Sequence, residues 1–287
     1  MKRRILGKTG ESLSILGFGG ILVMKEEQAH ANRLVAEAVD KGINYFDVAP
    51  TYGDAEDRLG PALKPFRKDV FLACKTVLRT AAEAEKQLHE SLNKMQTDYF
   101  DLYQFHGFPN LEEAKQALGP GGAVETFVKA KKEGLIRHIG FSVHDVEAGL
   151  YAMEQFPFDT ILFPCNFVLY HSGNFGPQLR DAAVKREMGL LALKSMAKTH
   201  WPSEPESHSE SKCWYEPIDD PELAHLAIRF TLSEPVTSIL SPGEEKYFRI
   251  ALDYLEKGFT PLSEEERDFL KQEASRLQPL FRYKAAS

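Results

Sequence analysis

The 287-residue sequence has few cysteines and no long apolar run. Its three cysteines, Cys74, Cys165 and Cys213, lie far apart and form no Cys-x-x-Cys pair, so zinc-ribbon and iron–sulfur sites have no ligand set. Their odd number fits a reducing compartment better than a disulfide framework, and we expect all three to be buried as small hydrophobic side chains. No stretch approaches the roughly 18 apolar residues of a membrane span.

The N-terminal segment also lacks the apolar core of about 7–15 residues that marks a signal peptide. We therefore expect a soluble, cytoplasmic protein with no membrane partner. The net charge of -7 and the pI near 5.8 argue against a nucleic-acid partner, because phosphate contacts need clustered Lys and Arg. The nine histidines include no His-Glu-x-x-His or His-x-His pair, which disfavours a metal hydrolase.

Short apolar runs alternate with longer amphipathic stretches along the chain. Eight runs have the near-continuous hydrophobicity of strands buried on both faces: 15–18, 43–47, 70–75, 100–106, 136–143, 160–167, 189–196 and 236–240. Apolar residues at helical spacing predict helices at 27–41, 81–95, 122–133, 145–155, 177–187, 221–232 and 244–257. This alternation means parallel strands joined by helices. Eight repeats favour a closed (β/α)8 TIM barrel over an open doubly wound sheet.

The two ends of the chain predict additions to this barrel. Residues 2–6 and 12–16 flank a Lys8-Thr9-Gly10 turn, so residues 1–16 are expected to form a β-hairpin cap. Residues 263–277 predict an extra C-terminal helix, with Ser263 as N-cap and Glu266 completing a capping box. No Pro-, Gly- or Ser-rich linker divides the chain, and we expect residues 1–287 to form a single domain.

Two segments interrupt the strand–helix rhythm, at residues 107–121 and 197–220. Loops of this length in a compact domain are usually functional. Each segment follows the C-terminal end of a predicted strand, and this is the face on which barrels place their chemistry. We therefore expect both to be long loops at the active face.

Four polar residues lie at or just after the ends of consecutive predicted strands. Asp47 ends the second strand, and Tyr52 follows five positions later. Lys75 ends the third strand and His106 the fourth. Each residue alone has an ordinary structural explanation, but the ends of parallel barrel strands share one rim. The pattern therefore predicts that the four side chains converge.

Such a cluster suits the reduction of a carbonyl group, which needs a hydride on carbon and a proton on oxygen. A free tyrosine has a pKa of about 10, so it donates poorly at neutral pH unless a neighbour makes it more acidic. An ammonium at Lys75 would lower the pKa of Tyr52, and Asp47 would keep that ammonium charged. His106 could orient or donate to the substrate oxygen.

The segment Phe46-Asp47-x-Ala49-x-x-Tyr52-Gly53-x-Ala55-Glu56-x-x-Leu59-Gly60 resembles the signature of the aldo-keto reductase family. Residues 6–10, 134–142, 227–230 and 241–243 are similar to further blocks of that family, so the resemblance covers nearly the whole chain. It implies an NAD(P)H-dependent oxidoreductase that reduces small aldehydes or ketones to alcohols. In that case Asp47, Tyr52, Lys75 and His106 form the catalytic tetrad, with Tyr52 as general acid.

The sequence lacks a Gly-x-Gly-x-x-Gly opening a helix, so a Rossmann cofactor site is disfavoured. The family resemblance instead implies a cofactor extended across the barrel mouth. It places the nicotinamide carboxamide at Ser142 and Asn166, and the pyrophosphate at Lys194, Ser195 and Met196. Two positions depart from the family: Val143 replaces the usual Asn, and Asn166 replaces Gln, with His144 as an alternative amide contact. For Lys194, an outward-facing strand lysine is an equal alternative.

The residues after Gly243 bear on the choice between the two nicotinamide cofactors. The family mostly uses NADPH and clamps its 2′-phosphate with Arg or Lys. Here Glu244 and Glu245 come first, and a carboxylate near the ribose favours NADH. Lys246 and Arg249 follow and favour the phosphate. We expect NADP(H) to be preferred, with NAD(H) as the alternative.

Other functions compete with this prediction. One is a regulatory subunit of the same fold that binds the cofactor with little or no turnover. Another is a lyase that uses Lys75 as a Schiff-base nucleophile, although the Asp47 partner argues against it.

Four apolar residues are candidates for lining a substrate pocket or for ordinary core packing, namely Phe18, Met24, Phe108 and Trp201. The natural substrate, the reaction direction and the oligomeric state stay open.

Overall fold

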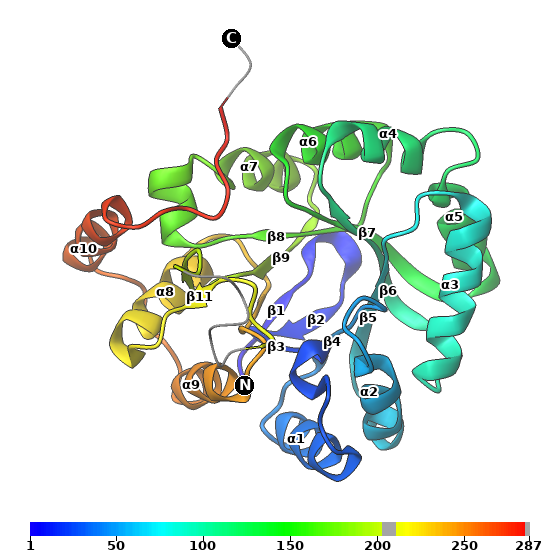
Figure 1. The fold of residues 1–287 in the computed structure, drawn as a ribbon, viewed down its shortest axis with the longest axis horizontal. Coiled ribbons are helices and arrows are strands. Elements are labelled where there is room, and N and C mark those ends of the chain that lie inside the picture. The colour runs from blue at the N-terminus through cyan, green and yellow to red at the C-terminus, as the bar shows by residue number, and fades with distance from the viewer. Residues whose placement is uncertain (203–210, 285–287) are drawn as a thin grey trace.

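The structure, a computed structural model, describes residues 1–202 and 211–284 and contains a closed barrel of parallel strands (Figure 1). Around the barrel the order is β12-β3-β4-β5-β6-β7-β8-β9. The strands are β3 (Leu16–Gly19), β4 (Tyr45–Asp47), β5 (Phe71–Thr76), β6 (Phe100–Phe108), β7 (Ile136–Val143), β8 (Thr160–Pro164), β9 (Gly189–Leu193) and β12 (Ser238–Leu240). The predicted (β/α)8 barrel is confirmed, although several strands are shorter than their apolar runs.

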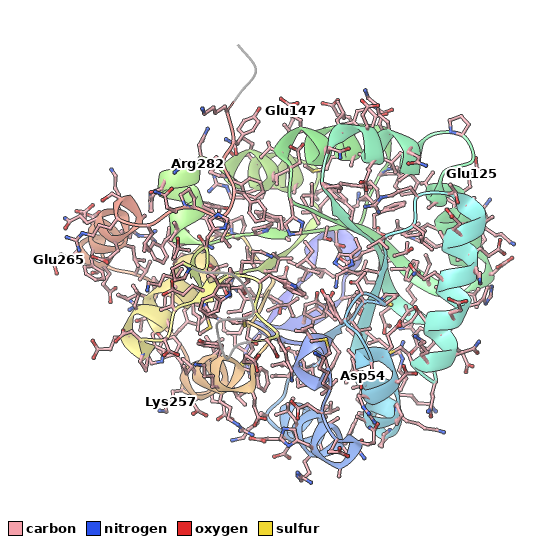
Figure 2. The ribbon with its side chains drawn as sticks, in the orientation of Figure 1. Asp54, Glu125, Glu147, Lys257, Glu265 and Arg282 are labelled. Atoms are coloured by element: carbon pink, nitrogen blue, oxygen red, sulfur yellow. The ribbon has the colours of Figure 1, made fainter. Side chains whose placement is uncertain are left out.

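Helices form a ring outside the strands (Figure 1). They are α1 (Gln28–Asp40), α2 (Ala55–Leu63), α3 (Ala81–Lys94), α4 (Leu111–Leu118), α5 (Ala123–Glu133), α6 (Val146–Gln155), α7 (Pro177–Lys185), α8 (Pro221–Ser233), α9 (Glu245–Glu256) and α10 (Glu264–Ser275). Each buries an apolar stripe, whereas charged side chains such as Glu125, Glu147 and Lys257 point outward (Figure 2). Within residues 1–202 and 211–284, no helix is long and apolar enough to cross a membrane.

The predicted N-terminal hairpin closes the end of the barrel at which the strands begin. It consists of β1 (Arg3–Ile5) paired antiparallel with β2 (Ser12–Ser14). Leu6 and Leu13 are buried in one cluster with Tyr45 and Phe71, the first residues of β4 and β5. The opposite end, where the predicted catalytic residues lie, is therefore left open. At the other terminus, the capping box of Ser263 and Glu266 is confirmed.

The expectation of a long loop at 107–121 is wrong. Strand β6 runs on to Phe108, and α4 follows within two residues. The Asn110 side chain caps this helix by accepting from the Glu113 N–H at 3.0 Å, and α4 buries Ala114 and Ala117. A short amphipathic helix with a good N-cap was therefore mistaken for a polar loop.

Of the segment 197–220, for which we expect a long loop, the structure describes residues 197–202 and 211–220. The segment contains a small antiparallel ribbon of β10 (Ala197–Thr199) and β11 (Glu216–Pro217). Its residues 203–210 lie outside the described residues. Helix α2 was not predicted, because Gly60 and Pro61 both lie inside it and both residue types disfavour helix interiors.

Gly60 is required where α2 meets the end of α3. A Cβ at this position would lie 2.5 Å from the Lys94 carbonyl oxygen and 2.7 Å from the Met95 Cα. Both atoms belong to the backbone, which cannot move as a flexible side chain can. We expect Gly60→Ala to lower the free energy of unfolding by about 1–3 kcal/mol, measured by urea denaturation. Glu90→Ala, at an exposed position on α3, is the control and should change it by less than about 0.5 kcal/mol.

Candidate active site

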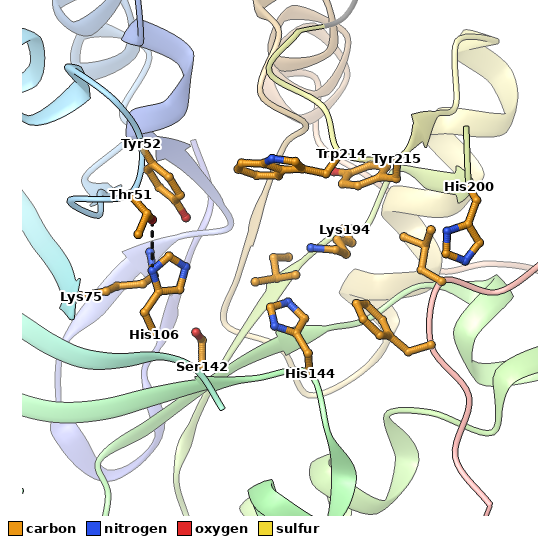
Figure 3. Close-up of a pocket in the computed structure, with 13 residues that line it drawn as sticks. Thr51, Tyr52, Lys75, His106, Ser142, His144, Lys194, His200, Trp214 and Tyr215 are labelled. Carbon is orange, nitrogen blue, oxygen red and sulfur yellow. Dashed lines mark hydrogen bonds between the residues drawn. The ribbon is translucent and has the colours of Figure 1, made fainter. Parts of the chain in front are cut away.

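The four residues predicted from strand ends meet at the open rim of the barrel. Asp47 is the last residue of β4, Lys75 lies near the end of β5 and His106 near the end of β6. Tyr52 lies between β4 and α2. Figure 3 shows Tyr52, Lys75 and His106 on the same side of one cavity. The Lys75 Nζ lies 5.3 Å from the centroid of the Tyr52 ring.

Asp47 and Lys75 form a buried ion pair, and each side chain is only 1% exposed. The Asp47 carboxylate also accepts hydrogen bonds from the Tyr45 hydroxyl and the Gln104 amide, both at 3.1 Å. Burial by itself would lower the pKa of Lys75, but its interactions with Asp47 and Tyr52 together outweigh burial, and the pKa is raised. Lys75 therefore carries its proton at neutral pH, as the sequence led us to expect.

Tyr52 departs from expectation in the direction of its pKa. Burial raises the pKa of Tyr52 above its usual value, and the Lys75 ammonium only partly offsets this. The predicted acidic phenol is therefore wrong for the free protein. The reason is that the Lys75 charge is already balanced by Asp47, so it cannot fully compensate the phenolate for its lost hydration. Tyr52 consequently keeps its proton and is available as a donor.

His106 stands beside Tyr52 as a neutral imidazole. Its ring meets the Tyr52 ring edge to face, with centroids 5.8 Å apart. Burial, reinforced by the positive charge of Lys75, lowers the pKa of His106 to about 2. Its Nδ1 lies 3.4 Å from the Thr51 hydroxyl oxygen. A neutral imidazole has one N–H to donate, so His106 can contact a substrate oxygen without carrying charge.

A cavity of about 680 Å³ opens beside these residues. Besides Tyr52, Lys75 and His106 it is lined by Thr51, Ser142, His144, Leu193, Lys194, His200, Trp214, Tyr215, Leu280 and Phe281. All of residues 107–121 are described, and none of them lines the cavity, whereas the described part of the segment 197–220 contributes three side chains. Two more come from the chain after α10 and were missed from sequence. These two residues are Leu280 and Phe281. An apolar pair that follows a capped helix is the sequence feature that could have predicted their burial against the barrel.

Ser142 and His144, the predicted carboxamide contacts, both line the cavity. The Ser142 Oγ accepts a hydrogen bond of 2.7 Å from the Gly107 N–H, so its own hydroxyl proton remains available. Burial lowers the pKa of His144 to about 3, and its ring packs 5.1 Å from Phe281. The Val143 side chain is fully buried in the core instead. His144 thus lines the cavity, whereas Val143 does not.

Three other predicted cofactor-binding residues are buried below the surface of the cavity. Asn166 is 1% exposed, and its amide is used internally, donating to the Lys194 carbonyl at 2.8 Å and accepting from the Leu169 N–H at 2.9 Å. Ser195 and Met196 are fully buried. None of the three lines the cavity, so their contact with a cofactor stays a prediction. Phe18 and Phe108 are also core residues.

A narrow extension of the site leads from Tyr52 toward Gly243. This second cavity measures only about 70 Å³ and is bordered by Lys212, Trp214 and Tyr215. Lys212 holds the segment in place: its ammonium donates to the Leu22 carbonyl at 2.9 Å and to Glu26 at 2.7 Å. At about 70 Å³ this space is far smaller than the main cavity of about 680 Å³.

The two cations predicted to bind a 2′-phosphate both have acidic partners. The Arg249 guanidinium donates to Glu37 at 2.9 and 3.1 Å and to Glu245 at 2.7 Å. Lys246 lies 3.1 Å from Asp219. A phosphate at this place would have to compete with these carboxylates or share the cations with them.

Comparison with known proteins identifies the family. The model of the Aldo/keto reductase family matches residues 16–200, which is more than half of the chain. The chain belongs to this family. The aldo/keto reductases are oxidoreductases, and the matched region contains all four residues of the predicted tetrad.

Individual relatives are similar at moderate identity. L-galactose dehydrogenase of Arabidopsis thaliana is 30% identical over 237 residues, covering 73% of this chain and 72% of that protein. Oxidoreductase YqkF of Bacillus subtilis is 32% identical over 159 residues, so the match spans 50% of this chain and about half, 49%, of the relative. The holo form of aldo-keto reductase AKR11C1 from Bacillus halodurans has the same fold, with a TM-score of 0.75, 24% identity and 99% coverage of both chains.

Proposed function

We propose that this aldo/keto reductase reduces aldehydes and ketones to alcohols with NAD(P)H, and that Tyr52 is the general acid. The observation that carries the proposal is the position of a protonated phenol beside a charge-balanced ammonium at the edge of a 680 Å³ cavity. A bound NAD(P)H would supply the hydride. The chain itself supplies the proton and the site for the carbonyl oxygen.

The charges present before and during the reaction explain how Tyr52 can donate its proton. Before reaction the phenol is neutral and burial keeps it so. As negative charge develops on the carbonyl oxygen, Tyr52 donates its proton, and the resulting phenolate faces the Lys75 ammonium. Asp47 keeps Lys75 protonated throughout. The neutral His106 can donate a hydrogen bond to the same oxygen and so hold it next to Tyr52.

A cofactor panel tests the proposal directly. Purified protein is titrated with NADPH and NADH in parallel, and a set of aldehydes and ketones is then assayed with the tighter-binding form. We expect oxidation of the cofactor that depends on the carbonyl compound. Cofactor binding without turnover of any carbonyl would favour the regulatory subunit instead. Trapping of a carbonyl compound on Lys75 by borohydride would favour the Schiff-base lyase.

The preference for NADP(H) that we expect from the sequence is opposed by the carboxylates around Arg249. Glu245→Gln removes one of them and leaves the guanidinium freer to bind a 2′-phosphate. We expect the ratio of NADPH to NADH affinity to rise about three- to fivefold, the scale of a partly exposed ion pair. Fluorescence titration measures both dissociation constants. Glu256→Gln, on the same helix but paired with Lys41, is the control, and an equal change in it would refute this explanation.

A further inference from the structure

Lys194 projects into the main cavity from the end of β9. Figure 3 shows it between Trp214 and His144, on the opposite side of the cavity from Tyr52 and His106. It lines the cavity together with the tetrad residues, so the alternative of an outward-facing strand lysine is wrong. The side chain therefore faces the same cavity as Tyr52 from the opposite side.

The backbone at Lys194 holds this side chain in place. Its φ of 63° lies in the left-handed region, which residues other than Gly, Asn and Asp rarely adopt. Two hydrogen bonds to the Lys194 carbonyl maintain the conformation, one of 2.8 Å from the Asn166 amide and one of 3.0 Å from the Ala197 N–H. Residues kept in such conformations by their surroundings concentrate at functional sites. This gives the buried Asn166 a positioning role.

Lys194 differs from the other lysines near the site in its charged partners. The two buried lysines of the described residues, Lys75 and Lys212, are paired with Asp47 and Glu26, whereas Lys194 is half-buried. Within residues 1–202 and 211–284, the structure shows no such ion pair for Lys194, and no acidic side chain lines the main cavity. The contacts that the structure gives its Nζ are aromatic, 5.5 Å from the Tyr215 ring centroid and 5.9 Å from that of Phe281.

The other titratable groups near the cavity do not provide a counter-ion for Lys194. Burial without a counter-ion lowers the pKa of Lys194 to about 8, so the amine is still mostly protonated at neutral pH. His106 and His144 are neutral there, and the Lys75 charge is neutralised by Asp47. A protein with a net charge of -7 thus presents an ammonium in its reaction cavity that no acidic side chain among the described lining residues neutralises. Such a site favours an anionic ligand.

We infer that Lys194 determines substrate specificity by binding a carboxylate group of the substrate. The inference rests on the proposed function and makes it more specific: the substrate is an aldehyde or ketone that carries a carboxylate on an apolar body. Trp214, Tyr215 and Phe281 provide the apolar surface for that body. A carboxylate is favoured over a phosphate ester because one ammonium balances one negative charge, whereas a phosphate dianion usually recruits several donors.

A matched pair of substrates measures the effect of the charge. 4-Carboxybenzaldehyde and 4-formylbenzamide have nearly the same shape, but only the first is an anion. We expect kcat/KM to be about 10- to 100-fold higher for the carboxylate, the range for a charge-assisted hydrogen bond in a partly buried site. The difference should appear mainly in KM. Lys194→Met should bring the ratio close to one, and Lys194→Arg should retain part of it.

Two further measurements make the test specific. Lys198→Met removes a lysine four residues away that is paired with Glu216 and does not line the cavity, so it should leave the ratio unchanged. Binding is followed independently by tryptophan fluorescence, since Trp214 lines the cavity, using 4-(hydroxymethyl)benzoate and its amide as non-reducible ligands. The benzoate should bind more tightly, and Lys194→Met should abolish the difference.

Several results would overturn the inference. A wild-type ratio near one, or a ratio that Lys194→Met leaves unchanged, would contradict it. A tenfold weaker cofactor affinity in Lys194→Met with the substrate ratio intact would assign the lysine to the cofactor phosphates, as the sequence first suggested. A Lys194-dependent preference for 4-formylphenyl phosphate over the carboxylate would show a phosphate site. If neither aldehyde is reduced but the benzoate is still bound selectively, the proposed function fails while the anion site stands.

Discussion

Tyr52→Phe is expected to lower kcat/KM for carbonyl reduction by about 10²- to 10⁴-fold, the contribution typical of a positioned general acid. The substitution removes only the phenolic oxygen. The ring contacts to His106 and Trp214 can remain, and the ion pair of Lys75 with Asp47 is untouched. Cofactor affinity should therefore change less than about twofold, since the change removes no bulk from the site. Steady-state kinetics and fluorescence titration of the cofactor measure the two quantities.

The matched control is Tyr151→Phe, which deletes the same atom from helix α6, outside the cavity. It should keep the activity of the unmodified protein. If Tyr52→Phe were as active as this control, another group would have to deliver the proton, and the assignment of Tyr52 would be abandoned. A loss of cofactor binding in parallel with activity would instead indicate that Tyr52 acts in binding.

Lys75→Met is expected to have the largest effect on stability. The Asp47 carboxylate, which is only 1% exposed, loses its counter-ion. Removing one partner of a buried ion pair typically lowers the free energy of unfolding by about 3–5 kcal/mol. Hydrogen bonds from Tyr45 and Gln104 compensate only part of the lost charge interaction. Activity should fall as well, because no ammonium then faces the Tyr52 phenolate. Urea denaturation and kinetics measure the two effects.

A double substitution separates these two roles. Asp47→Asn combined with Lys75→Met removes both charges, so the double variant should be more stable than Lys75→Met alone. Its activity should stay low, since the phenolate still lacks a cation. A double variant that is no more stable than the single one would show that the loss came from packing of the Lys75 side chain and not from an unpaired charge.

Much of the barrel could be predicted from local patterns. Strands buried on both faces leave continuous apolar runs, helices leave a 3.6-residue period, and their alternation allows few topologies. Capping signals are equally local, as at Ser263. The failures were local as well: Gly60 and Pro61 concealed α2, and α4 was overlooked within a polar stretch despite its N-cap at Asn110. Intrinsic propensity is weak compared with the burial that tertiary packing provides.

The sequence by itself determined the family, the barrel and the four rim residues, because a repeated strand–helix unit and a dense motif are written in consecutive positions. Only the tertiary structure decided the balance of charges. Burial raises the pKa of Tyr52 although Lys75 lowers it, Glu37 pairs with Arg249 from 212 positions away, and Lys194 faces a cavity that no acidic side chain of the described residues lines. Each of these depends on desolvation and on partners distant in the chain, and neither is encoded in the spacing of neighbouring residues.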